Sequence, residues 1–410
     1  MEHHIHTLQN GIRILFVPTK TTVSHACFLV NAGSRDESDA HMGLAHFIEH
    51  ILFKRTLKRN TYQILNRIES VGGDLNAYTT KEYTCIHASF LNPYLERSTE
   101  LFQDILFHSI FPEDEIEKER SVILDEIASY EDQPEESIQD DFEDLIFSGH
   151  PLGRNILGNV ATVSQIKREN ILNFIANNYR THQMVFAVMG NYTWQKVKHL
   201  SEKYFQVIPE NSSDLQRTAP VNLPTSHSQH HKPINQAHYI LGGTGYSFHH
   251  PYKTGLMLLN HYLGAGGMSS VLNLEIREKY GIAYTIESNY IPLSDTGIFN
   301  IYLGTDEEKL KKAKLLITKE LTKLQAKSWT SAQLNQLKKR LIGQIALAEE
   351  NKIGLIISLA KSLLDFNYID SLAMVFQKIE AVKPAEMNAI AKEVLNFDTL
   401  SSLTFMPSED

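Results

Sequence analysis

The chain has 410 residues, of which 42% are hydrophobic and 21% are charged, and its formal net charge at pH 7 is −9. This length exceeds one ordinary hydrophobic core, so we expect two domains of about 200 residues each. The negative charge, without a basic stripe carrying interleaved aromatic residues, argues against a nucleic-acid-binding protein. Cys27 and Cys85 are too few for a disulfide framework, and we expect both to be small buried residues.

Targeting and membrane-spanning segments are not indicated by the sequence. No stretch approaches the roughly 18 to 20 apolar residues that a membrane-spanning helix needs. The first residues, MEHHIHTLQNGIRILF, have neither a basic start before a long apolar run nor an Arg- and Ser-rich, acid-poor composition. We therefore expect a cytoplasmic protein that does not act at a membrane, and we interpret HHIH at 3–6 as surface residues.

The first half of the chain alternates short predicted strands and helices. β-Branched and aromatic residues favour strands, and Pro or Gly marks several of the element ends. The pattern predicts strands at 11–19 and 25–33, helices at 42–54 and 60–71, a two-stranded hairpin over 74–90, and helices at 92–108 and 112–131.

A polar stretch rich in Pro and Ser over 209–233 predicts an exposed linker, and its His230 and His231 are interpreted as solvated residues. We therefore place an N-terminal domain at 1–210, a linker at 211–234 and a C-terminal domain at 235–410. The second half is predicted to contain a strand at 237–245, helices at 251–263 and 268–279, strands at 283–292 and 297–305, and long amphipathic helices from 306 onward.

The two halves share an element order, which predicts an internal duplication. LNRIESVGGDLNAYTTKEYT (65–84) can be laid over LNLEIREKYGIAYTIESNYI (272–291), each running from Leu-Asn through a helix end into a strand that contains Ala-Tyr. The sequence therefore predicts two homologous α+β domains. Only the first half carries three polar residues in LAHFIEH, where the second half has LMLLNHYL.

The segment GLAHFIEHILF, residues 43–53, places His46, Glu49 and His50 in an otherwise apolar helix. Residues four apart lie on the same face of a helix, so the two imidazoles can bind one metal ion. Glu49 lies beside them and can reach a water on that metal. The order H-x-x-E-H is the inverse of the H-E-x-x-H of many zinc proteases. The alternative is that these side chains are hydrogen-bonded core residues.

A catalytic zinc needs a third protein ligand and keeps its fourth position for water. The best candidates lie in EIEKERSVILDEIASYEDQP, residues 115–134. Glu119 and Glu126 are seven residues apart, which is about two helical turns, so both project from one face. The periodicity leaves open whether these residues face a metal or belong to a solvated acidic surface.

HFIEH followed by this Glu-rich helix resembles the inverted-motif zinc peptidases of the pitrilysin, insulinase and mitochondrial processing peptidase family. The resemblance implies that Glu126, 76 positions after His50, is the third zinc ligand and that Glu119 supports a ligand. GGDLNAYTTKEYT resembles the family's active-site edge strand, and HPLGRNILG (150–158) its loop after the ligand helix. The segment 269–290 resembles the part of the second half whose Arg and Tyr, here Arg277 and Tyr284, contact the substrate.

This resemblance implies a fold and a mechanism. The fold is two homologous α+β domains in a clamshell arrangement, each a mixed sheet flanked by helices, and chains of this length pair into dimers that enclose a chamber. The implied enzyme is a metalloendopeptidase that holds one Zn²⁺ per chain, uses Glu49 as general base and cleaves peptides or unfolded segments. The substrate is expected to pair as an added strand with Asn76, Ala77 and Tyr78.

Other functions stay open at this point. The chain could be a non-catalytic or partner subunit of a heterodimeric, processing peptidase-like complex rather than a homodimer. It could also be a peptide-binding module with a structural zinc site, although such sites are usually closed by four ligands, often cysteines. A third alternative is a purely structural helix that binds no metal.

Overall fold

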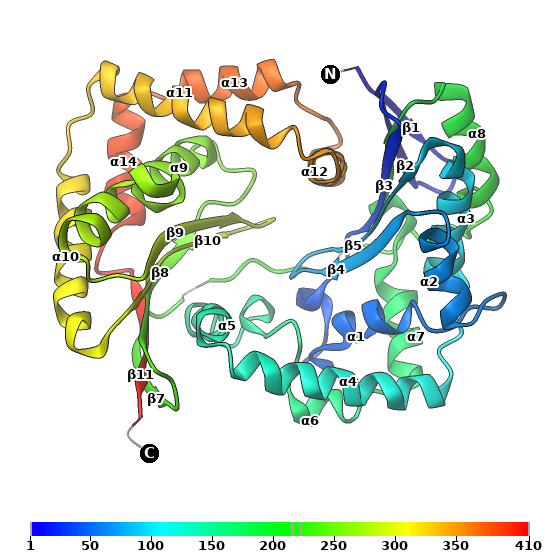
Figure 1. Ribbon diagram of the computed structural model, residues 1–410, viewed down its shortest axis with the longest axis horizontal. Helices are drawn as coiled ribbons and strands as arrows, with labels where there is room; N and C mark the ends of the chain where they lie inside the picture. The colour runs from blue at the N-terminus through cyan, green and yellow to red at the C-terminus, as the bar shows by residue number, and fades with distance from the viewer. Residues whose placement is uncertain (1, 215–216, 222, 409–410) are drawn as a thin grey trace. The chain divides into compact units, whose positions relative to one another are not determined.

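The computed structural model describes residues 2–214, 217–221 and 223–408, and its contacts divide the chain into two compact units (Figure 1). The first unit comprises Met1–Ala128, Arg154–Arg217 and Ala348–Ser371, and the second comprises Ser129–Gly153, Thr218–Leu347 and Leu372–Asp410. These units differ from the contiguous domains predicted at 1–210 and 235–410, because each unit takes one helical segment from the other half of the chain.

The first unit is built on a six-stranded mixed sheet with the strand order β1-β2-β6-β3-β5-β4. In this sheet only the β2–β6 pair is parallel, and the remaining pairs are antiparallel. The central strands are almost completely buried because both faces of the sheet are covered. The strands are β1 (His4–Thr7), β2 (Arg13–Pro18), β3 (Val23–Val30), β4 (Asp74–Thr79), β5 (Thr84–Leu91) and β6 (Met184–Gly190).

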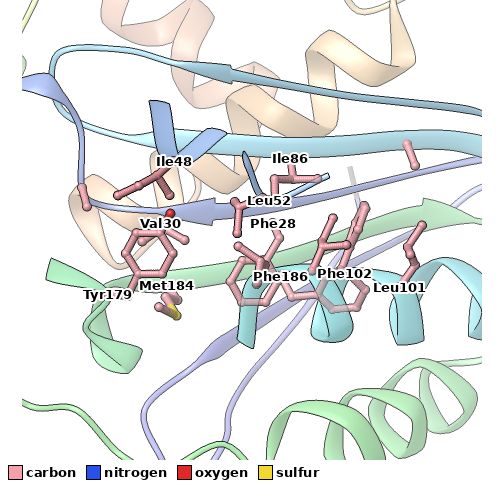
Figure 2. Close-up of a cluster of buried hydrophobic side chains, with 14 of the residues drawn as sticks. Phe28, Val30, Ile48, Leu52, Ile86, Leu101, Phe102, Tyr179, Met184 and Phe186 are labelled. Carbon is pink, nitrogen blue, oxygen red and sulfur yellow. The ribbon is translucent and has the colours of Figure 1, made fainter. Parts of the chain in front are cut away.

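One face of this sheet carries the main core of the first unit. Alternate residues of β3, such as Phe28 and Val30, point to this face and meet Ile48 and Leu52 from the first helix and its end (Figure 2). The helices that supply this core are α1 (Leu44–Ile51), α2 (Thr61–Glu69), α3 (Leu95–Phe107), α4 (Glu113–Glu131), α7 (Arg168–Asn178) and α8 (Trp194–Phe205). The last residues of α4 belong to the second unit. The short helix α6 (Val160–Val163) lies between α4 and α7 in the sequence.

The other face of the first sheet is covered by α12 (Lys352–Phe366), a helix more than 150 residues away from the last strand, β6, in the sequence. Its Ala360 and Leu363 pack on Leu29 and on the buried Cys27 and Cys85. The guanidinium of Arg13 in β2 donates to the carbonyl of Leu363 at 2.7 Å, as a second donor beside the N–H of Asn367, and so ties the end of the helix to the sheet.

The second unit contains a five-stranded mixed sheet with the order β7-β11-β8-β10-β9. This order and its single parallel pair, β7–β11, reproduce β2-β6-β3-β5-β4 of the first sheet, which confirms the predicted duplicated α+β fold. The strands are β7 (His227–Lys232), β8 (Ala237–Gly245), β9 (Thr285–Pro292), β10 (Gly297–Thr305) and β11 (Ser401–Pro407).

Helices also cover both faces of the second sheet. α5 (Pro134–Ile146), which directly follows α4 in the chain, packs its Ile138 and Phe142 against strand residues such as Ile240 and Phe405. The helices on the other face are α9 (Lys253–Asn260), α10 (Glu307–Gln325), α11 (Ser331–Ala348), α13 (Leu372–Ala381) and α14 (Pro384–Val394). Among the described residues, no helix is both long and apolar enough to cross a bilayer.

One local prediction was wrong. Residues 227–232, predicted as linker, form the edge strand β7, because their backbone pairs with β11 although their side chains are polar and mostly exposed. Residues 4–6 of the HHIH segment belong to the edge strand β1, where Ile5 is exposed and the ring of His4 stacks on Trp194 with centroids 5.3 Å apart. The helix expected at 268–279 is present over 271–280, with a π-helical stretch over Asn273–Glu278, and it follows a short 3-10 turn at Gly267–Ser269.

Candidate metal centre and active site

Helix α1 carries the H-x-x-E-H motif, and its start is fixed by two features. Gly43 precedes the helix at φ +89°, a conformation that favours glycine, and a Cβ there would lie 2.5 Å from the carbonyl oxygen of Leu157. The buried carboxylate of Glu37 accepts the N–H groups of Gly43 at 2.9 Å and of Ala45 at 2.7 Å. These bonds satisfy donors that the first turn leaves unpaired, and they orient the helix.

The two histidines and Glu126 converge as the resemblance implied. The rings of His46 and His50 have centroids 4.6 Å apart. Oε2 of Glu126, on α4, lies 3.8 Å from Nε2 of His46 and 3.5 Å from Nε2 of His50. Within the described residues, these three form the one group of His, Cys, Asp or Glu side chains with ligand atoms close enough to hold a metal, all within 4.8 Å of one another.

The electrostatics of the two histidines differ. Burial, helped by the neighbouring His50, lowers the pKa of His46 to about 3, so its imidazole is neutral and can donate a lone pair. Burial also lowers the pKa of His50, but the hydrogen bond with Glu119 and the carboxylates of Glu126 and Glu49 outweigh burial, so its pKa lies above the ordinary value. His50 therefore holds a proton more readily than His46.

Glu119 orients His50 from the side opposite the ligand nitrogen. Its Oε2 lies 3.2 Å from Nδ1 of His50, so Nδ1 donates and Nε2 faces Glu126. The other oxygen of Glu119 pairs with Nζ of Lys54 at 2.6 Å. Burial raises the pKa of Glu119, but its bonds to His50 and Lys54 lower it more, so the carboxylate stays ionised. This arrangement fixes the imidazole tautomer that a metal requires.

Glu49 lies on the same helix face but is not part of the ligand group. Oε2 of Glu49 accepts the hydroxyl of Thr79, at the end of β4, at 2.7 Å. Burial raises the pKa of Glu49 above its ordinary range, and the bond from Thr79 opposes this rise. A carboxylate with a raised pKa, held beside two imidazoles, is suited to accept and return a proton.

The residues present fit a zinc ion. Two imidazole nitrogens and one carboxylate oxygen form the donor set of a catalytic zinc site with an open fourth position. Ligands at the usual bond lengths of a tetrahedral zinc lie roughly 3.4 Å apart, and the Nε2–Oε2 separation of 3.5 Å between His50 and Glu126 matches this value. Both cysteines are buried in the core between the first sheet and α12, so the structural zinc site considered from the sequence is not formed.

The other predicted site residues lie in two places. Asn76, Ala77 and Tyr78 are on β4, the edge strand of the first sheet, which also carries Thr79. Arg277 and Tyr284 belong to the second unit. Arg277 is exposed in the π-helical stretch, and Tyr284 is 54% exposed.

Three residues that support the site were not identified from the sequence: Thr79, Lys54 and Glu37. Thr79 follows the predicted edge-strand residues directly, and Lys54 is four positions after His50 on the same predicted helix. Helix spacing therefore offered a signal for Lys54. Glu37 lies in a loop, and its bonds to the start of α1 depend on a turn that no periodicity describes.

Comparison with known proteins identifies relatives along almost the whole chain. A family model described as insulinase (peptidase family M16) matches residues 13–160, and one described as peptidase M16 inactive domain matches residues 165–341. The uncharacterized zinc protease YmxG of Bacillus subtilis is 30% identical over 397 residues, covering 96% of each chain. An uncharacterized zinc protease of Mycobacterium leprae is 32% identical, covering 95% of this chain and 88% of its own.

Solved structures agree with this result. The crystal structure of a protease from Helicobacter pylori has a TM-score of 0.90 at 25% sequence identity and covers 99% of this chain and 100% of its own. A structure from Pseudomonas fluorescens, described as a peptidase M16 inactive domain, has a TM-score of 0.90 at 19% identity, covers 100% of this chain and 98% of its own, and supports the fold alone.

Proposed function

Because this chain belongs to the insulinase family of peptidases, family M16, we propose that it is a zinc-dependent endopeptidase that hydrolyses peptides or unfolded segments. The observation that carries the proposal is the convergence of His46, His50 and Glu126 on one point, with Glu49 beside them on the same helix face. The names of the curated relatives as zinc proteases support the choice of metal.

In the proposed mechanism, His46, His50 and Glu126 hold the zinc. Bound zinc would lower the pKa of a water molecule and polarise the peptide carbonyl. The carboxylate of Glu49 accepts a proton from the attacking water and returns it to the leaving amine. Glu119 keeps the proton of His50 on Nδ1, so that the lone pair of Nε2 stays available as a metal ligand throughout the cycle.

Substrate binding is proposed to use the free edge of β4. An edge strand has unpaired backbone groups, and an extended peptide can add to Asn76, Ala77 and Tyr78 as a further strand. This mode requires an extended substrate, which favours short or unfolded peptides. Arg277 and Tyr284 are proposed to hydrogen-bond the substrate carbonyl, and two copies of the chain are proposed to pair around an enclosed chamber.

The test is hydrolysis of an internally quenched peptide library by wild type, Glu49→Gln and the control Glu117→Gln, whose side chain is exposed on α4. All three proteins are compared at equal zinc content, measured by elemental analysis. We expect Glu49→Gln to lose at least about 100-fold in rate and Glu117→Gln to retain the wild-type rate. Equal rates of wild type and Glu49→Gln would refute the role of Glu49.

A second outcome bears on the alternative of a partner subunit. If wild type binds one zinc per chain but cleaves no peptide, a heterodimer becomes the better explanation, and copurification with a homologous chain would support it. The complete set of ligands and base in the first unit argues against a non-catalytic subunit. The description of the second family model as an inactive domain concerns residues 165–341, which contain none of these four residues.

A further inference from the structure

A basic pocket lies on the first unit, formed by residues 58–70 and by Arg97 of α3. It is an open hollow of about 320 Å³, lined by residues of the loop before α2, of α2 and of α3. Helices α2 and α3 lie side by side (Figure 1). Four of its lining side chains are cationic: Lys58, Arg59, Arg67 and Arg97. We call this site the basic pocket. None of its residues belongs to the metal centre.

The positive charge of the basic pocket is only partly neutralised. Arg59 pairs with Asp104 and with Glu100, and Arg67 reaches Glu100 at 3.3 Å. Among the described residues, no carboxylate pairs with Lys58 or Arg97, so two of the four positive charges stay uncompensated. Gathering like charges opposes folding unless an anion joins them, and this protein carries a formal net charge of −9.

Two guanidinium groups in the basic pocket also have unused hydrogen-bond donors. Nε of Arg67 and Nε of Arg97 are buried atoms without a hydrogen-bond partner. The side-chain bond of Arg97 is a long one, 3.3 Å, to the hydroxyl of Ser70. Buried charged donors normally find acceptors, because an unpaired one destabilises the fold. Both Nε atoms are shielded from solvent, so a ligand in the hollow would meet the terminal N–H groups of these side chains.

We propose that the basic pocket binds a phosphoryl-bearing anion. A phosphoryl group carries up to two negative charges and three acceptor oxygens, which matches the two uncompensated charges and the guanidinium groups that line the hollow. The fork of Arg suits this geometry better than a point charge does. The exposed ring of Tyr62, 72% exposed at the rim, offers a flat apolar surface for an attached organic group.

The same chemistry can come from free inorganic phosphate or from an organic phosphate, and binding measurements separate the two. Inorganic phosphate and adenosine monophosphate are each titrated by calorimetry into the zinc-loaded protein at low salt. These two ligands are chosen because both chelate zinc weakly. Equal affinities of the two ligands would show that the phosphate group alone accounts for binding in the basic pocket. Tighter binding of the nucleotide, lost in Tyr62→Leu, would identify an organic phosphate.

Variants locate the site. We expect Arg97→Gln and Lys58→Gln each to weaken binding about tenfold, and the exposed control Lys20→Gln to leave it unchanged. Lys58 is exposed and makes no side-chain bond among the described residues, so its replacement does not disturb the fold. Binding that is undetectable at 10 mM ligand, or that is equally tight in all three variants, would overturn the proposal. Peptidase activity is not a readout, so the result is independent of the proposed function.

Discussion

Replacing Thr79 by Val removes one hydroxyl and keeps the shape of the side chain. That hydroxyl donates to Oε2 of Glu49 at 2.7 Å and stabilises the carboxylate form, whereas burial favours the neutral form. A hydrogen bond to a charged group contributes about 1.5–3 kcal/mol, and we take roughly half of this because Glu49 is partly exposed to solvent. Losing this bond should destabilise the carboxylate form of Glu49 by about 0.7–1.5 kcal/mol, so the pKa of Glu49 should rise further above its ordinary value.

The sign of the effect follows from the role of Glu49 as a base. A higher pKa keeps Glu49 protonated to a higher pH, so the acid limb of the kcat/KM profile should move upward in Thr79→Val. At pH values well above that limb, the rate should fall less than about tenfold, because the base itself remains.

The assay is peptide hydrolysis between pH 5 and 9 at saturating zinc, with Thr79→Ser as the control that retains the hydroxyl. An acid limb unchanged in Thr79→Val, or moved equally in Thr79→Ser, would refute the reasoning. Thermal unfolding of the two variants checks that the fold is intact.

Two further predictions concern metal binding and stability. The carboxylates around His50 raise its pKa, so protons should compete with zinc for this imidazole as the pH falls through and below neutrality. Glu119→Gln removes one of these carboxylates and should move the loss of zinc affinity to lower pH. Competition with a chromophoric chelator measures the zinc affinity, and an onset at the same pH in both proteins would contradict the role given to Glu119. Leu363→Ala should cost about 2–4 kcal/mol of unfolding free energy, because Leu363 is 1% exposed between α12 and the first sheet, whereas the exposed Ser358→Ala should change little in urea titrations.

The candidate metal ligands could be picked out from the sequence because their spacing is local. His46 and His50 share a helix face by their four-residue separation, and Glu119 and Glu126 share one by their separation of seven. The structure adds the contact between the two helices, at 3.5 Å from His50 to Glu126. Periodicity could not supply this contact; the resemblance to a peptidase family did.

The division of the chain into units was not predictable from local patterns. The sequence of α12, KIGLIISLAKSLLDF, is apolar on several faces, which indicates a deeply packed helix but not the sheet it packs on. Its partners, such as Leu29 and Val185, lie far away in the chain. Strand β7 shows the opposite difficulty: HSQHHK has a polar composition typical of a linker, and its backbone pairing with β11 leaves no pattern in the side chains.

The duplicated topology also allows α1 to be compared with the helix in the same place of the second unit. α1 follows β3 as α9 follows β8, yet α9 (KTGLMLLN) and the buried His261 after it carry no H-x-x-E-H motif, so the same sheet order is built without that motif. In α1 the polar residues oppose stability: His46 is 7% exposed, its Nδ1 atom has no hydrogen-bond partner, and burial depresses its pKa to about 3. Replacing His46 by Leu should therefore raise the stability of the zinc-free protein while abolishing zinc binding, a combination that a structural histidine would not produce.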